Sequence, residues 1–274
     1  MNGYTVRRFT PERRWIVESL NRSRQKNNVH YTFEVDMTET LARFAAIQKR
    51  TRRAISMTAY MVYVLGQLAG KHPILRTLRK GRSGVCEFGN ADILVAFEKA
   101  DHTGTRQLQY EVLRSVDAMS ATAVVESMRA LLKRKEVTRG SQRPGLRSTW
   151  LPWFLRRLVF HRVLADPVKA NRMRGTLAVT SVGFFGPPIP SYGLPLVPHT
   201  GCLTIGSVYK RPRLIDGSLQ DRDFLYLTAT VDHDLIDGAV GVRLVKELCE
   251  MLQEGSGVAD MEASAASRVL AERG

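Results

Sequence analysis

The stretch between residues 224 and 251 constrains the fold more than any other part of the sequence. It begins with an apolar segment, Phe224–Val231, passes through the polar run Asp-His-Asp-Leu-Ile-Asp-Gly, and continues with an apolar repeat of helical period. The repeat starts near Gly238 and places four apolar residues on one helical face, namely Val240, Leu244, Leu248 and Met251. A strand that leads directly into an amphipathic helix predicts a mixed α/β domain.

The rest of the chain carries the same mixture of patterns. Residues 29–37 alternate apolar and polar side chains, as in a half-buried strand, and residues 10–27 form a predicted helix with Thr10 as N-cap and Pro11 at its first position. The segment 56–71 is apolar over much of its circumference, so we expect it deep in the core. The remaining predicted elements are helices from about 38 and at 120–133, and strands at 92–97, 107–112, 176–182 and 202–208.

The composition describes a compact globular protein. Hydrophobic residues make up 44% of the 274 residues, which is enough for a packed core. The three cysteines, Cys86, Cys202 and Cys249, lack CxxC spacing, so the sequence predicts neither a disulfide framework nor a metal site. No segment has the roughly 18 consecutive apolar residues of a membrane span, and the N-terminal residues lack an apolar signal region. We therefore expect a cytoplasmic protein without membrane contact.

The net charge of +15 is concentrated in two blocks. Residues 1–82 carry 17 basic and 5 acidic side chains, and residues 129–174 carry 13 and 2. Such blocks support nonspecific phosphate binding, so a non-catalytic basic scaffold or nucleic-acid-binding protein is one alternative function. The sequence has no helix-turn-helix, zinc-finger or RNA-binding aromatic signature, and we do not expect a nucleic-acid partner.

Two segments suggest internal boundaries. Residues 136–148 are polar and contain Gly140, Pro144 and Gly145, which predicts a flexible excursion within a domain spanning 1–254. Residues 255–274 are rich in Ala, Ser and Glu and predict a polar C-terminal tail or a loose terminal helix. The segment Trp150–Leu164 mixes aromatic and basic residues. We interpret it as core or interface packing, and contact with a membrane surface or a binding channel is the alternative.

His233 is the candidate catalytic residue. The predicted strand ends at this residue, and the chain then turns through Asp237 and Gly238 into the helix. A strand-to-helix junction presents side chains rigidly to a crevice, and an imidazole can act there as general base near neutral pH. The alternative is a hydrogen-bonded histidine at a turn, with Asp237 as helix N-cap and Gly238 required for close backbone approach.

Five motifs in order resemble the catalytic domain of the dihydrolipoamide acyltransferases of 2-oxo acid dehydrogenase complexes. The segment from His233 to Leu244 resembles that family's DHRVIDGA-x-G-x-R signature, and Gly175–Gly183 followed by Phe185-Gly186 resembles its GTFTISNLG-x-FG segment. Three further segments match, namely Thr10–Arg14, Tyr31–Asp36 and Pro198–Val208 followed by Lys210-Arg211-Pro212. The resemblance covers residues 8 to 253.

This resemblance implies a chloramphenicol acetyltransferase-like fold, in which a mixed sheet flanked by helices forms a two-layer sandwich. It also implies homotrimers with active sites between subunits. The function that it implies is CoA-dependent acyl transfer, in which His233 removes a proton from a thiol, hydroxyl or amine acceptor that attacks an acyl thioester. Coenzyme A enters as the acyl-CoA co-substrate, and the resemblance assigns no residue to it.

The resemblance implies roles for several other residues. Thr180 stands where the family has its oxyanion-stabilising serine, and a hydroxyl donor there can contribute roughly 3–4 kcal/mol. The adjacent Ser181 is the alternate, although a regular strand would point it to the opposite face. Asp237 is mainly structural in the family, where it pairs with a basic residue near the N-terminus. Here that residue would be Arg13 or Arg14.

Some features depart from the family. The chain has no room for a lipoyl domain, so we expect no bound lipoyl group, and a polar C-terminal segment predicts an isolated trimer. Phe184–Pro198 contains five prolines, which predicts a reshaped acceptor side. The donor is acyl-CoA or an acyl carrier protein, and the acceptor a small molecule or a carrier-bound group. A condensation-like enzyme acting on carrier-protein thioesters is a weaker alternative, because that superfamily has a second histidine where this chain has Asp232.

Overall fold

The fold is described from a computed structural model of the chain. It describes residues 3–100, 106–133, 165–182 and 189–271, together with a few single positions between 152 and 162. The predicted excursion at 136–148, most of Trp150–Leu164 and the motif residues Gly183, Phe185 and Gly186 lie outside the described residues.

The helices are α1 (Pro11–Ser23), α2 (Thr38–Thr51), α3 (Met57–Lys71), α4 (Ala121–Lys133), α6 (Pro167–Arg174), α7 (Gly238–Gln253) and α8 (Val258–Ala271). The strands are β1 (Asn28–Asp36), β2 (Thr77–Lys80), β3 (Gly84–Glu87), β4 (Ile93–Ala100), β5 (Arg106–Leu113), β6 (Leu177–Ser181), β7 (Gly201–Ile215) and β8 (Ser218–Asp232). Sequence patterns predicted most of these, and missed the short β2–β3 hairpin and α6.

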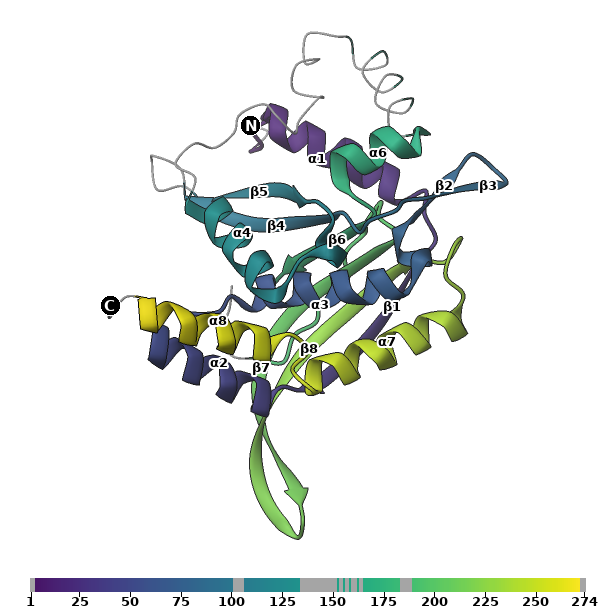
Figure 1. Cartoon of the computed structure of the whole chain (residues 1–274). Coiled ribbons are helices and arrows are strands. Elements are labelled where there is room, and N and C mark those ends of the chain that lie inside the picture. The colour runs from purple at the N-terminus through teal and green to yellow at the C-terminus, as the bar shows by residue number, and fades with distance from the viewer. Residues whose placement is uncertain are drawn as a thin grey trace.

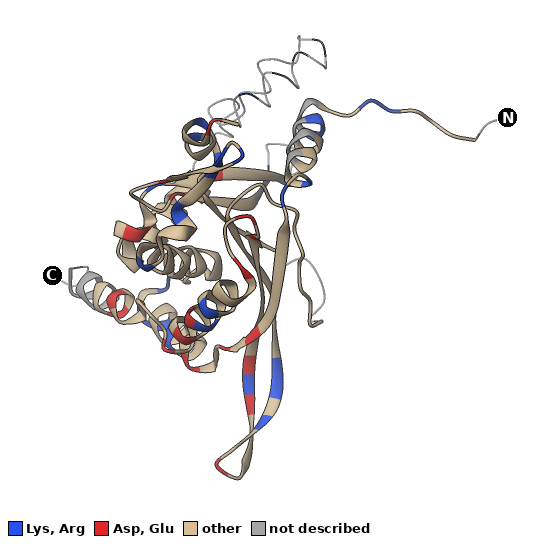
Figure 2. Ribbon diagram, turned by 90° about the vertical axis from the view of Figure 1, so that its right-hand side faces the viewer, with Lys and Arg blue, Asp and Glu red and all other residues tan. Residues whose placement is uncertain are grey.

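Six strands form one mixed sheet in the order β1-β8-β7-β6-β4-β5. Strand β6 is parallel to both of its neighbours, whereas the other pairs are antiparallel. Helices α2, α3, α7 and α8 lie against one face of this sheet (Figures 1 and 2). The mixed sheet and its helical layer confirm the predicted two-layer α/β architecture.

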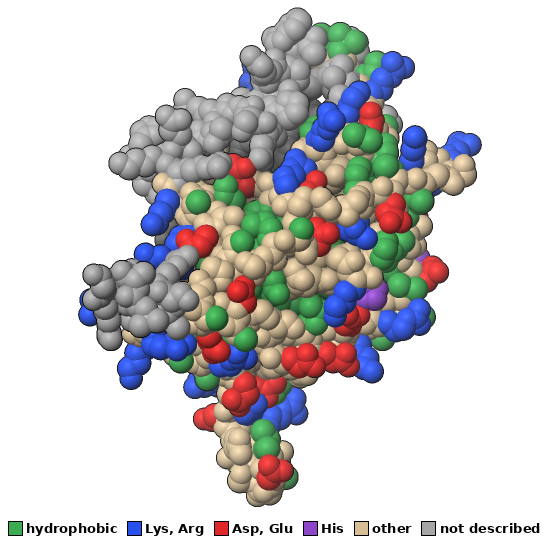
Figure 3. Space-filling model, viewed as in Figure 1, with side chains coloured by type: hydrophobic (Ala, Val, Ile, Leu, Met, Phe, Trp, Pro, Cys, Tyr) green, Lys and Arg blue, Asp and Glu red, His purple; other side chains and the backbone are tan. Residues whose placement is uncertain are grey.

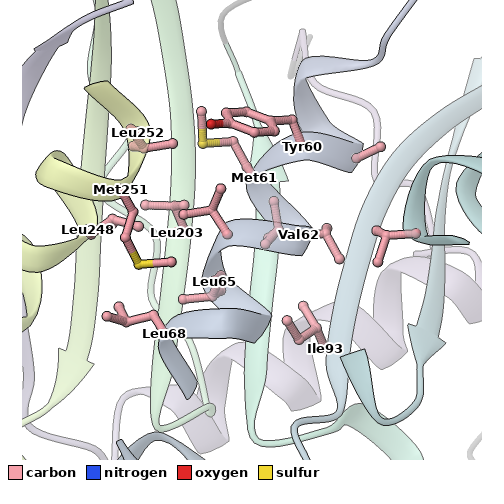
Figure 4. Close-up of a cluster of buried hydrophobic side chains, with 14 of the residues drawn as sticks. Tyr60, Met61, Val62, Leu65, Leu68, Ile93, Leu203, Leu248, Met251 and Leu252 are labelled. Atoms are coloured by element: carbon pink, nitrogen blue, oxygen red, sulfur yellow. The ribbon is translucent and has the colours of Figure 1, made fainter. Parts of the chain in front are cut away.

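Helix α3 is the centre of the core. Its N-cap Ser56 accepts a hydrogen bond from the backbone N–H of Ala59, and the helix is buried over most of its circumference, as the sequence predicts. Figure 4 shows α3 side chains packed between residues from the sheet and from α7. These neighbours include Ile93, Leu203, Leu248, Met251 and Leu252.

The two faces of the sheet differ in chemistry. On the helix side, the central strands contribute the apolar residues Leu177, Val179, Leu203, Ile205, Leu225, Leu227 and Val231. The alternating residues of the same strands point to the other face. There the central strands place mainly polar side chains, including Thr32, Thr180, Thr204, Thr228, Thr230 and Asp232. We call this side the polar face.

Strands β7 and β8 are much longer than predicted and form a projecting hairpin, at the bottom of Figure 1. Its turn is Asp216-Gly217, with positive φ at both residues, as a two-residue hairpin turn requires. Hydrophobic periodicity does not reveal the outer half of this hairpin, because ion pairs stabilise it. The guanidinium of Arg213 lies 3.1 Å from Glu34, and Arg222 Nε donates to Asp36 at 2.8 Å.

Of the two alternatives predicted for the C-terminal residues, a polar tail or a terminal helix, the structure shows a helix, α8. Residues 258–271 form this helix, which packs against α2 and α4. Val258, Met261 and Ala265 are buried in the main core, so this part of the chain is a structural element. The three residues lie at i, i+3 and i+7, and polar neighbours mask this periodicity in the composition.

Among the described residues, no helix is long and apolar enough to span a membrane.

Candidate active site

His233 lies exposed on a tight turn between β8 and α7. Its backbone N–H donates to the carbonyl of Asn27 at 2.8 Å, which ties the turn to the start of β1. The N–H groups of Leu235 and Ile236 both donate to the carbonyl of Asp232 at 3.0 Å. The backbone on either side of the histidine is therefore fixed, while its imidazole faces outward.

A buried ion pair precedes the histidine. The carboxylate of Asp232 is almost fully buried and pairs with the ammonium of Lys26, whose side chain is 16% exposed. Burial lowers the pKa of Lys26, and the pairing with Asp232 partly opposes this shift. Removal of one partner would leave the other charge buried without compensation, which is strongly destabilising.

A second carboxylate follows the histidine. Asp234 Oδ1 accepts a hydrogen bond from the Asn27 side chain at 2.8 Å, and Oδ2 pairs with Arg79 of β2. The Asn27 hydrogen bond, together with Arg79, lowers the pKa of Asp234. Two ion pairs thus flank His233 in the sequence, and neither Lys26 nor Arg79 was predicted from the sequence.

A buried histidine lies close to the first of these pairs. His199 precedes Thr200, whose carbonyl accepts the N–H of Asp232 at 3.0 Å. Burial and the nearby cations Arg174 and Lys26 hold the pKa of His199 well below its usual range. A histidine so placed is neutral, and the cations around it favour that state.

Asp237 and Gly238 begin helix α7. Asp237 occupies the N-cap position, but its side chain makes no capping hydrogen bond, and its carbonyl accepts the N–H of Gly241 at 2.8 Å. The Tyr31 hydroxyl donates to the carbonyl of Gly238 at 3.2 Å. A side chain at Gly241 would overlap the Tyr31 ring, so this glycine allows β1 and α7 to pack closely.

The N-terminal arginines do not reach Asp237. Within the described part of the chain no ion pair joins Asp237 to Arg13 or Arg14, whose contacts are with residues 9 and 10. The Arg13 N–H donates to Thr10 Oγ1 at 3.2 Å, and Arg14 Nε donates to the Phe9 carbonyl at 3.2 Å. Both arginines therefore take part in local contacts at the start of α1, where Thr10 caps the helix as predicted.

Thr180 lies on the polar face, in a row of four threonines. The strand register aligns Thr180 of β6 with Thr204 of β7, Thr228 of β8 and Thr32 of β1. Ser181 aligns with Ile205, a residue of the helix-side core, so its side chain lies on the other face.

Thr180 and His233 of one chain lie at opposite ends of the strands. Thr228 is level with Thr180, and the strand between Thr228 and Asp232 spans about 13 Å at ~3.3 Å per residue. Two strand spacings of about 4.8 Å each add to this separation. A single chain therefore cannot bring these two side chains to the same reacting bond.

The proline-rich segment after β6 covers part of the polar face. The Ser191 N–H donates to Ser207 Oγ at 3.0 Å. The Tyr192 and Tyr226 rings pack edge to face, with 4.9 Å between their centroids. A Cβ at Gly193 would lie 2.8 Å from Thr204 Cγ2, so a glycine allows this close approach. The described part of the segment thus lies beside the threonine row.

Among the described residues, no group of three or more His, Cys, Asp or Glu is arranged to hold a metal ion. The titratable groups around His233 form ion pairs and hydrogen bonds instead. The flanking carboxylates, Asp232 and Asp234, were visible in the sequence. Their partners were not, because Lys26 and Arg79 lie more than 150 residues away along the chain.

Comparisons with known proteins match this geometry. A model of the 2-oxoacid dehydrogenases acyltransferase family (catalytic domain) matches residues 161–258, the segment that contains Thr180, His233 and Asp237. The lipoamide acyltransferase component of the branched-chain alpha-keto acid dehydrogenase complex from Bacillus subtilis is 23% identical over 258 residues, which are 91% of this chain and 53% of the relative. The catalytic-domain model of this acyltransferase family therefore matches the C-terminal part of the chain, and the resemblance found in the sequence is confirmed there.

Solved structures show the same fold as this chain. The probable dihydrolipoamide acetyltransferase from Listeria monocytogenes superposes with a TM-score of 0.70 at 21% identity, over 93% of this chain and 97% of that chain. A chloramphenicol acetyltransferase superposes with a TM-score of 0.50 at 14% identity, over 87% and 93%. These superpositions confirm the predicted chloramphenicol acetyltransferase-like fold. The chain spans about half or less of the length of the curated relatives it matches.

Proposed function

We propose that this protein is an acyltransferase that moves an acyl group between a coenzyme A thioester and a thiol, hydroxyl or amine acceptor. The observation that carries the proposal is His233, an exposed imidazole on a rigid turn inside the segment that matches the acyltransferase family. An exposed imidazole can act as a general base that accepts a proton from an acceptor group.

The chemistry assigned to His233 is general base catalysis. The imidazole takes the proton of the acceptor's S–H, O–H or N–H as the acceptor atom attacks the thioester carbonyl carbon. The tetrahedral intermediate then expels the CoA thiolate, and the imidazolium returns the proton to that sulfur. This transfer is balanced and needs no redox partner.

Thr180 is proposed to donate its hydroxyl to the oxyanion of the tetrahedral intermediate. One such donor contributes about 3–4 kcal/mol to transition-state stabilisation. Because Thr180 and His233 of one chain lie at opposite ends of the strands, we assign the threonine to a neighbouring subunit. A homotrimer with sites between subunits satisfies this requirement, because each head-to-tail contact pairs one histidine with one threonine.

Positive surface charge is consistent with an anionic acyl donor. Lys and Arg side chains gather over α6 (Figure 3), on the side of the molecule where β8 leads into α7 (Figure 1). The nucleotide part of coenzyme A is a polyanion, and acyl carrier domains are usually acidic, so opposite charge would speed their encounter. Coenzyme A is the donor that we propose.

The direct test replaces the base. We expect His233→Ala to lower kcat for thiol release from acyl-CoA by about 10²–10⁴-fold, with the folded state retained because the side chain is exposed. A panel of thiol, hydroxyl and amine acceptors is assayed by following free CoA thiol. Full turnover in the variant would refute the mechanism.

Mixing two inactive variants tests the shared site. His233→Ala and Thr180→Val chains are unfolded and refolded together in equal amounts. In a trimer with shared sites, random mixing restores about one quarter of the wild-type sites, because every mixed trimer contains one intact histidine–threonine contact. Separately refolded variants are the control. Unrestored activity in mixed trimers, identified by mass spectrometry, would contradict the shared site.

A further inference from the structure

The β2–β3 hairpin touches the turn that carries His233 through one side chain. Arg79 of β2 is 43% exposed, and its guanidinium pairs with the carboxylate of Asp234. The same guanidinium donates through Nε to the carbonyl of Gly81 at 3.1 Å, within its own hairpin. An arginine fork holds two partners in a fixed relative geometry, so Arg79 links the hairpin to the turn.

The other side of the turn is held by β1 and the residues before it. Asn27 binds the turn twice, because its carbonyl accepts the His233 N–H at 2.8 Å and its side chain donates to Asp234 at 2.8 Å. The Asp234 N–H lies 3.3 Å from Asp232 Oδ1, and Asp232 also pairs with Lys26. The peptide units on both sides of the imidazole are therefore anchored, and Arg79 is an exposed anchor.

We propose that Arg79 is a positioning residue, which holds the His233 imidazole in its productive orientation through the ion pair with Asp234. This inference rests on the proposed role of His233 as the base. A misplacement of about 1 Å in a catalytic group can cost about 100-fold in rate, so a turn anchored on one side only is expected to react more slowly.

The exposure of Arg79 separates positioning from stability. Surface ion pairs contribute little to the free energy of unfolding, in contrast to the buried Lys26–Asp232 pair. Loss of the Arg79 side chain should therefore leave the folded state intact, and its effect should fall on the chemical step. Lys26 does not allow the same test, because its replacement would leave Asp232 charged and buried.

The test compares Arg79→Gln with Lys80→Gln, which removes the same charge from the next residue of the same strand. Lys80 is exposed, and no ion pair of it is seen among the described residues. We expect Arg79→Gln to lower kcat about 10-fold, with KM for acyl-CoA within about twofold of wild type and a melting midpoint within about 2 °C. Lys80→Gln should retain the wild-type kcat.

Reversal of the two charges of the Arg79–Asp234 pair tests whether an ion pair at this place restores kcat. Arg79→Asp should be slower than Arg79→Gln, because it places two carboxylates together. The double variant Arg79→Asp/Asp234→Arg restores an ion pair of opposite sense and should recover kcat to within about threefold of wild type. Equal losses in Arg79→Gln and Lys80→Gln would overturn the proposal. An absence of recovery in the folded double variant would also overturn it.

A spectroscopic readout keeps this inference separate from the proposed function. The ring signals of His233 are assigned in ¹³C/¹⁵N-histidine-labelled protein by their loss in His233→Ala. Arg79→Gln should shift or broaden these signals, whereas Lys80→Gln should not. If His233→Ala remains active, the proposed function fails. Unchanged His233 signals in Arg79→Gln would refute the positioning role whatever the outcome for activity.

Discussion

Neighbouring residues of β7 and β8 that point to opposite faces of the sheet are equally buried but differ in chemistry. Leu203 and Leu227 on the helix side are 1% and 0% exposed, and Thr204 and Thr228 on the polar face are 1% and 0% exposed. The first pair packs against α3 and its neighbours. The second belongs to the row of threonines that contains Thr180.

This difference indicates that the two faces serve different purposes. Apolar burial stabilises the folded state by about 25 cal/mol per Å² of surface removed from water, which suits the helix side. A buried hydroxyl contributes little unless it is hydrogen-bonded, and the Thr228 hydroxyl has no hydrogen-bond partner among the described residues. Thr228 therefore contributes less to the free energy of unfolding than an apolar residue would. Such a position is expected on a surface used for chemistry or for subunit contact.

The sharpest test of the comparison substitutes two neighbouring residues that point to opposite faces of the sheet. We expect Leu203→Ala to lower the free energy of unfolding by about 2–5 kcal/mol, because it opens a cavity under α3. Thr204→Val, an isosteric change at the next position, should alter it by less than about 1 kcal/mol. Urea unfolding followed by circular dichroism measures both variants, and equal losses would show that the faces contribute alike.

The pH dependence of the unfolding free energy tests the burial of His199. His199 is neutral in the folded protein, because its pKa lies well below the usual value, whereas the unfolded chain protonates it below about pH 6.5. The unfolding free energy should therefore be constant above this pH. It should fall by up to about 1.4 kcal/mol per pH unit on acidification below it.

The control for this titration is His199→Gln, which cannot bind the proton. The difference in slope between wild type and variant, measured by urea unfolding from pH 7.5 to 5, isolates this histidine from His30, whose pKa is also lowered by burial. Parallel stability curves for the two proteins would contradict the assignment.

The smallest expected effect concerns the unpaired hydroxyl. Thr228→Val replaces a buried hydroxyl without a described partner by a methyl group, and it should raise the unfolding free energy by about 1 kcal/mol. Thr230→Val is the matched control. It should be destabilising by a similar amount, because the Thr230 hydroxyl lies 2.9 Å from His30 Nδ1. A loss of stability in Thr228→Val would mean that a subunit or ligand uses that hydroxyl.

Much of the architecture could be predicted from the sequence because it follows hydrophobic periodicity. Helix α3 and the helix after His233 have clear apolar patterns, and both were found. The outer β7–β8 hairpin was missed because ion pairs of Glu34 and Asp36 with distant arginines stabilise it. For the residues of α8 the sequence left both a tail and a terminal helix open, because few of these residues are strongly apolar.

The candidate site also contains residues that the sequence predicts and residues that it does not. His233, Thr180 and Asp237 stand out in the sequence because they lie in contiguous motifs. The flanking carboxylates pair with Lys26, which lies before β1, and with Arg79, which lies in β2. Only the tertiary fold brings these residues together. Within the described part of the chain Asp237 makes no ion pair with its predicted partners, and sequence order does not indicate which arginine a carboxylate will meet.

The separation of Thr180 and His233 along the strands has a consequence for how the protein is switched off. Under the roles proposed for Thr180 and His233, a lone subunit carries two half-sites and no complete one. Simple dilution should then silence the protein without any loss of secondary structure. The cell could govern such a catalyst by its concentration alone, with no inhibitor and no covalent mark.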